Sequence, residues 1–137
     1  MRIAVAVGVL ALFTAVSAQQ IAPRAVATTA DLMTALTAPS STMVFRAASE
    51  PPSDAKDWIA LRAQALMLAE SGNLLLVGTR VRDENEWTRQ AAALRDAAEA
   101  AAKAAGAKDA MALSEAGERV YETCEQCHQK YLTQAPL

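Results

Sequence analysis

The chain has 137 residues, 53% of them hydrophobic, and a formal net charge of −2. This length fits one ordinary domain, and the slightly acidic balance argues against a protein that binds nucleic acid or adheres to anionic membranes. Any docking partner is expected to be basic or uncharged.

The first 18 residues predict a secretory signal peptide. Arg2 gives a positive start, the apolar run over 3–16 is too short to span a membrane, and Ser17 and Ala18 supply the small residues of a cleavage site. Removing 18 of the 137 residues leaves 119, and the loss of Arg2 leaves 12 basic against 15 acidic residues, a net charge of −3. We expect a periplasmic protein without stable membrane insertion, with an uncleaved anchor as the alternative.

The remaining sequence predicts an all-α fold. After an N-terminal tether at 19–28, segments rich in helix-forming residues alternate with short stretches containing proline, glycine and aspartate. Short connections favour antiparallel neighbours, so we predict an antiparallel four-helix bundle. The domain spans 29–132, its tail is 133–137, and its four helices are expected at 29–48, 54–76, 84–105 and 109–132.

Individual residues predict where these helices begin, bend and end. Asp83 and Glu86 have the spacing of a capping box, and Gly106 is expected to take a left-handed conformation that ends the third helix. Pro39 lacks an amide hydrogen and is expected to kink the first helix. Gly117, in the middle of the fourth helix, is expected to admit a neighbouring helix or a macrocycle at close range.

Cys124, Cys127 and His128 form the run Cys-Glu-Gln-Cys-His and are the only cysteines and the only histidine in the chain. A C-x-x-C-H run is typical of c-type haem attachment. On a helix the three side chains fall within an arc of about 100°, so both thiols can reach one edge of a haem while the imidazole approaches the iron. We predict one covalent haem c, with His128 as the proximal iron ligand. Such a protein is not expected to be an enzyme.

Three other readings of the motif fit less well. A structural zinc site usually takes four protein ligands and a catalytic one takes three; this run supplies only three, and no second half-site exists elsewhere in the sequence. A thiol redox pair is expected next to a βαβ unit, and the surrounding sequence shows no strand pattern. A disulfide between residues three apart closes almost no loop and gains little stability from it.

The predicted core also favours a haem, because bulky residues are scarce. Downstream of the signal, the only aromatic residues are Phe45, Trp58, Trp87, Tyr121 and Tyr131. Four helices of about 20 residues would be underfilled by them, and a haem inside the bundle would supply the missing apolar volume.

An exported four-helix chain with Cys124, Cys127 and His128 on its last helix, followed by Tyr131, resembles the class II c-type cytochromes, the cytochrome c′ family. The resemblance extends from about residue 29 to residue 132. It implies a left-handed bundle with haem near one end, His128 as the proximal ligand, and a first-helix residue on the distal side of the iron. It leaves a homodimer open, because bundles of this family often pair through their first helices.

In that family the distal residue decides the function. Members with a methionine there are six-coordinate and transfer electrons, whereas members with a bulky apolar residue are five-coordinate and bind nitric oxide or carbon monoxide. Aligning the first helices puts Met33 at the distal position, with Thr29 where many members carry an arginine. The resemblance therefore implies a mono-haem carrier with His128 and Met33 as axial ligands and an unidentified redox partner protein. The alternative is a five-coordinate gas-binding protein.

Other candidates for the haem environment rank lower. Met43 would face inward only after a kink, Met67 is expected in the core, and Met111 points away from the haem face of its helix. A haem without a sixth ligand also stays open. Arg80, Arg82 and Arg89 are candidates for pairing with the haem propionates.

Overall fold

A computed structural model describes residues 22–132, and all regular secondary structure in this range is helical. The predictions of a signal peptide at 1–18 and a tail at 133–137 lie outside the described residues. The all-α fold is confirmed. Its elements are α1 (Thr29–Leu32), the π-helical η1 (Met33–Thr37), α2 (Ala38–Ser49), α3 (Ala55–Leu74), the 3₁₀ turn η2 (Gly78–Arg80), α4 (Glu86–Ala107) and α5 (Ala110–Tyr131).

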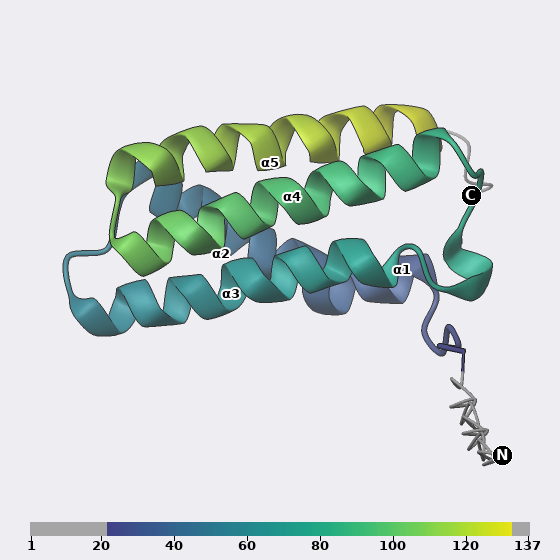
Figure 1. The fold of residues 1–137 in the computed structure, drawn as a ribbon, viewed down its shortest axis with the longest axis horizontal. Coiled ribbons are helices and arrows are strands. Elements are labelled where there is room, and N and C mark those ends of the chain that lie inside the picture. The colour runs from purple at the N-terminus through teal and green to yellow at the C-terminus, as the bar shows by residue number, and fades with distance from the viewer. Residues whose placement is uncertain (1–21, 133–137) are drawn as a thin grey trace, which may run out of the picture.

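These elements form an antiparallel four-helix bundle (Figure 1). The segments α1, η1 and α2 follow one another without a break and make the first long helix. The helix α3 packs against α4, α4 packs against α5, and α2 closes the bundle by packing on both α3 and α5. The start of the first helix, the end of α3, the start of α4 and the end of α5 therefore meet at one end of the molecule.

Short polar side chains cap three of the helices. Thr28 and Asp31 form a capping box at the start of α1. The carboxylate of Asp54 accepts a hydrogen bond from the Asp57 amide at 2.8 Å, and Asp109 accepts bonds from two amides in the first turn of α5. These contacts satisfy amide donors that would otherwise lack a partner, which explains why α3 and α5 begin where the sequence predicted.

The predicted capping box at the start of α4 is wrong. Asp83 accepts a hydrogen bond from the Trp87 amide at 3.0 Å, but the carboxylate of Glu86 is bound by Arg89 at 2.6 Å and by Gln90 at 2.9 Å. Because its side chain is engaged within the helix, Glu86 does not cap the chain, and α4 begins at Glu86 itself.

The predicted end of α4 is also wrong. Gly106 stays inside the helix, and Lys108 takes the left-handed conformation with φ 55°. The amide of Asp109 then bonds the carbonyl of Ala104 at 3.0 Å. Alanine is a strong helix former, so the alanine-rich segment carries the helix past the glycine. The turn forms where Asp109 caps the next helix.

A π-helical segment, η1, precedes Pro39. Its ring nitrogen cannot donate to the preceding turn, and the helix widens over η1, where the amide of Ala38 bonds the carbonyl of Met33. The backbone at Ala38 keeps helical angles, φ −65° and ψ −47°. The predicted disturbance at Pro39 is therefore a bulge in a continuous helix.

Small residues let the helices pack closely. A Cβ atom added to Gly117 would lie 2.7 Å from the Cβ of Ala48, which confirms a close approach, made here by α2. Gly72 does the same between α3 and α4, where an added Cβ would lie 2.8 Å from the carbonyl oxygen of Ala91. The α4 face that packs inward is largely alanine, with buried Ala97, Ala98, Ala101, Ala102, Ala104 and Ala105.

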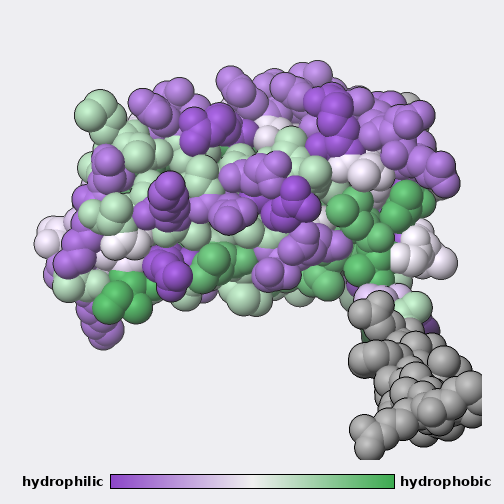
Figure 2. Space-filling view, viewed as in Figure 1, coloured by the Kyte–Doolittle hydropathy of each residue, from purple (hydrophilic) through white to green (hydrophobic). Residues whose placement is uncertain are grey.

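Polar and apolar residues are unevenly distributed on the surface. In the view of Figure 2, polar residues cover most of α4 and α5, while apolar residues gather along α3 and at the end where the chain passes from α3 to α4. Exposed apolar side chains on α3 include Ile59, Leu66 and Leu74. Within residues 22–132, no helix has the combination of length and apolar content that crossing a membrane requires.

Candidate functional site

A largely apolar cavity of about 470 Å³ lies between the first helix, α4 and α5, toward the end of the bundle where α5 finishes. Its volume falls in the range usual for small-molecule and cofactor sites. The first helix, the end of α3 and α4 supply most of the apolar wall, and α5 supplies the Cys-x-x-Cys-His run. The lining residues from the first three elements are Met33, Thr37, Ala38, Ser41, Phe45, Leu75, Trp87, Gln90, Ala91 and Leu94.

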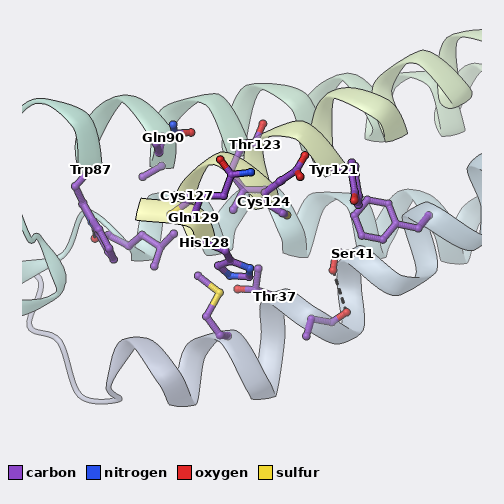
Figure 3. Close-up of a pocket in the computed structure, with 17 residues that line it drawn as sticks. Thr37, Ser41, Trp87, Gln90, Tyr121, Thr123, Cys124, Cys127, His128 and Gln129 are labelled. Carbon is purple, nitrogen blue, oxygen red and sulfur yellow. Dashed lines mark hydrogen bonds between the residues drawn. The ribbon is translucent and has the colours of Figure 1, made fainter. Parts of the chain in front are cut away.

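The three motif residues line this cavity together. Cys124 and Cys127 are half-buried free thiols on successive turns of α5. The imidazole of His128 extends from α5 toward the first helix, near Thr37 (Figure 3). Thr123, buried beside Cys124, donates its hydroxyl to the carbonyl of Arg119 at 2.7 Å, so it satisfies its polar group within α5. The helix thus presents both thiols and the imidazole to one space.

Burial keeps both thiols in the protonated state. It raises the pKa of Cys124 from its ordinary 9.0 to about 11, and the neighbouring Cys127 contributes a smaller part of the rise. Burial also raises the pKa of Cys127, assisted by the negative charge of Glu86. Thiol–disulfide chemistry depends on the thiolate and is favoured by a lowered pKa. This environment is the opposite of the one that a catalytic redox pair needs.

A bare metal ion also finds no ready site. Across the part of the chain that the structure describes, no three Cys, His, Asp or Glu side chains converge as metal ligands would. Cys124, Cys127 and His128 line one cavity, but their side chains do not converge on a common point where a single ion could bind. This spread suits a larger group that each side chain meets at a different place.

Met33 faces the same space from the opposite side. It lies in η1, half-buried, and lines both the main cavity and an adjoining cavity of about 360 Å³. His128, Cys127 and Trp87 also line both cavities. Met33 and His128 therefore approach one space from two different helices.

The other methionines lie elsewhere. Met43 is 42% exposed and lines a separate groove beside the α2–α3 connection. Met111 is 74% exposed, as its predicted direction implied. The prediction of a core position for Met67 is wrong, because its side chain is 44% exposed on the outer side of α3.

Of the three arginines considered for the propionates, two are engaged in other contacts. Arg80 is buried and donates to the carbonyls of Ala27 at 3.1 Å and Leu74 at 2.9 Å, so it ties the segment before α1 to the end of α3. Arg89 pairs with Glu86 on the surface of α4. Arg82 is exposed, lies over the Trp87 ring at 5.9 Å and lines the smaller cavity. Its guanidinium is the best placed of the three for an anionic group.

The wall that α4 contributes to the cavity was not predicted from the sequence. Trp87, Ala91 and Leu94 line the cavity at helical spacing of four and three residues, a pattern that a search for one apolar face of this helix would have found. The Trp87 indole donates to the carbonyl of Leu75 at 2.9 Å, which fixes the ring against the end of α3. Gln90 reaches α5, where its amide donates to Gln126, one of the two residues between the cysteines, at 3.4 Å.

The residues present fit a covalently held haem. Two thiols and an imidazole lie on one wall, a thioether lies on another, and the space between them is apolar and large enough for a cofactor. The soft sulfur and nitrogen donors are those that haem iron takes from proteins. Cys124 and Cys127 would hold the group, and His128 would ligate its iron.

Comparison with known proteins agrees with this chemistry. Residues 81–132 match the family model described as Cytochrome C′, and neither the curated proteins nor the solved structures contain a match to the chain. The matched segment begins at the loop before α4, spans α4 and α5, and includes Cys124, Cys127 and His128. The match confirms the predicted resemblance and supports a c-type cytochrome. Residues 81–132, the half of the bundle that carries the attachment motif, are thus similar to the cytochrome c′ family.

Proposed function

We propose that the protein is an exported mono-haem c-type cytochrome that carries electrons through a His/Met-ligated haem and performs no substrate turnover. Cys124 and Cys127 would form the two thioether bonds, with His128 as the proximal ligand and Met33 as the distal ligand. The observation that carries the proposal is the shared cavity, which His128 lines from α5 and Met33 lines from η1. His128 is the only imidazole in the chain, so a second strong ligand has to be of another kind.

The bound haem would supply one-electron redox chemistry. The protein's part is to hold, enclose and tune that group. Apolar side chains such as Trp87 and Leu94 exclude water from the cavity wall, and a dry environment together with the choice of axial ligands sets the reduction potential. A thioether at the distal side also occupies the position that a gas would need. These features support a carrier.

The second candidate is a five-coordinate protein that binds nitric oxide or carbon monoxide. The observation in its favour is the match to the Cytochrome C′ family model, because the family that the chain resembles includes five-coordinate, gas-binding members. The two candidates make different demands on Met33. In the carrier Met33 is a ligand, whereas in the gas-binding protein it is only part of the cavity wall.

Met33→Leu separates the two functions. Leucine has nearly the same volume, so the bundle should persist and only coordination should change. For a carrier, the unmodified protein is low-spin and unreactive toward carbon monoxide, and the variant becomes high-spin and binds the gas. Met43→Leu is the matched control, since Met43 lines a different groove, and its spectra should equal those of the unmodified protein. A high-spin unmodified protein that binds carbon monoxide would support the gas-binding function instead. A Met33→Leu spectrum identical to that of a low-spin parent would show that Met33 is not a ligand.

Cellular placement and partners form the rest of the proposal. The predicted signal peptide and the extracytoplasmic attachment of c-type haem support a periplasmic location. The acidic balance of the chain supports a redox partner with a basic docking surface. A homodimer remains part of the proposal, and sedimentation of the haem-bearing protein tests it.

A further inference from the structure

The last turn of α5 is bonded to the start of α4 through one carboxylate. The Tyr131 hydroxyl donates to Asp83 Oδ2 at 2.5 Å, and the other oxygen of the same carboxylate accepts the Trp87 amide at 3.0 Å. The Trp87 and Tyr131 rings meet edge to face, with centroids 4.9 Å apart and an interplanar angle of 78°. Asp83 thus links the end of one helix to the first turn of its neighbour.

This contact lies one helical turn from the proposed iron ligand. Tyr131 follows His128 by three residues, so the two side chains project from neighbouring positions of one helix face. Both residues, together with Trp87, line the smaller cavity. The helix ends at Tyr131, and terminal turns open easily because they lack half of their backbone hydrogen bonds. A side-chain tie at this place restrains the turn that carries the imidazole.

The charge states of the pair favour a lasting bond. The Tyr131 hydroxyl is the main cause that lowers the pKa of Asp83, followed by the Trp87 amide. Burial, and then the bond to Asp83, raise the pKa of Tyr131 to about 12. The carboxylate stays ionised and the phenol stays protonated at neutral pH. Lys130, 3.9 Å from Asp83 Oδ2, adds a further favourable charge.

We propose that Tyr131 and Asp83 form a positioning pair, here named the Tyr131–Asp83 latch, that fixes the orientation of the His128 imidazole toward the haem iron. The inference rests on the proposed role of His128 as proximal ligand. The groups that orient a metal-bound histidine influence its strength as a ligand, and axial ligand strength influences the reduction potential of a haem. The latch acts on the imidazole through α5.

Two conservative variants test the latch in the haem-bearing protein. Tyr131→Phe removes the hydroxyl and keeps the ring that packs on Trp87, and Asp83→Asn removes the charge of the acceptor. Hydrogen exchange of the backbone amides at 128–132 should quicken about tenfold in each variant, as expected for loss of a hydrogen bond to a charged group. The reduction potential should shift in the same direction in both, and the double variant should shift no further. Asp96→Asn is the control, because Asp96 forms an exposed ion pair with Arg95 farther along α4, and it should change neither quantity.

Two results would overturn the latch. Exchange at 128–132 equal to that of the parent would show that the bond restrains nothing. Faster exchange with an unchanged potential would show a purely structural contact. Failure of the proposed function looks different, because it is seen in the unmodified protein as the absence of covalent haem on a denaturing gel, and that result removes the latch's role as well. Failure of the latch alone requires a haem-bearing parent whose potential the variants leave unchanged.

Discussion

Gly117→Ala perturbs the contact between α2 and α5. The new Cβ would lie 2.7 Å from the Cβ of Ala48, whereas nonbonded carbons rest at about 3.5 to 4.0 Å. The two helices must therefore move apart by roughly 1 Å. Phe45 and Tyr121 line the main cavity from these same helices, so the displacement should reach the candidate site.

The expected magnitude follows from two opposing effects. Alanine in a helix interior is about 1 kcal/mol more favourable than glycine, and overpacking costs about 1 to 3 kcal/mol. Gly106→Ala isolates the first effect, because a Cβ there meets only the flexible side chain of Arg62 at 3.4 Å. Gly106→Ala should therefore stabilise the bundle, while Gly117→Ala should be about 1 to 3 kcal/mol less stable than that control.

Thermal unfolding of the haem-bearing variants measures this difference. For a domain of this size, 1 kcal/mol corresponds to roughly 3 to 5 °C in Tm. Ala48→Gly alone should cost about 1 kcal/mol of helix propensity. In the Gly117→Ala background that cost should be offset by recovery of the overpacking cost, since the substitution removes the opposing Cβ. Equal stabilisation by Gly117→Ala and Gly106→Ala, or no recovery with Ala48→Gly, would refute the close approach of α2 and α5.

Two other predictions concern the frame around the site. Trp87→Phe removes the donor to the Leu75 carbonyl and leaves a buried acceptor unpaired, so thermal or urea unfolding should show a loss of about 2 to 3 kcal/mol, and an unchanged stability would contradict that bond. The Thr28 hydroxyl and amide lower the pKa of Asp31, so this carboxylate stabilises the fold above its ordinary pKa and the stabilisation is lost as pH falls through the lower, folded value. Thr28→Ala should make Tm less sensitive to pH between about 5 and 3, and an unaltered pH profile would count against the capping box.

Much of the fold could be predicted from the sequence because its signals are local. Asp54 and Asp109 cap α3 and α5 from within one turn, and such contacts depend only on sequence spacing. The predicted end of α4 was wrong because two local signals competed. Gly106 favoured a stop, but alanine propensity and the cap at Asp109 favoured continuation to Ala107.

Predictions failed where packing between helices decides the outcome. Met67 is apolar and flanked by leucines, yet its direction on α3 places it outside, which depends on where α2 and α4 lie. Gly72 has the same close contact as Gly117 but no motif nearby to draw attention to it. Arg80 is buried because the segment before α1 folds back onto it, a long-range contact that local spacing cannot reveal.

In the candidate site, too, the local motif could be predicted and the long-range contacts could not. Cys124, Cys127 and His128 belong to one short run, so their joint placement on α5 follows from helix geometry alone. The facing walls come from residues separated by tens of positions, such as Met33 and Leu94. The family resemblance supplied Met33, whereas the α4 wall became visible only in the folded chain.

Every role proposed for this site depends on the covalent attachment of one haem through Cys124 and Cys127. The most direct test is the intact mass, under denaturing conditions, of the protein exported by cells that mature c-type cytochromes. The expected mass equals that of residues 19–137 plus one haem, and no haem should remain when both cysteines are replaced by alanine. An exported protein whose mass contains no haem, or a double variant that retains the haem, would contradict covalent attachment through these cysteines.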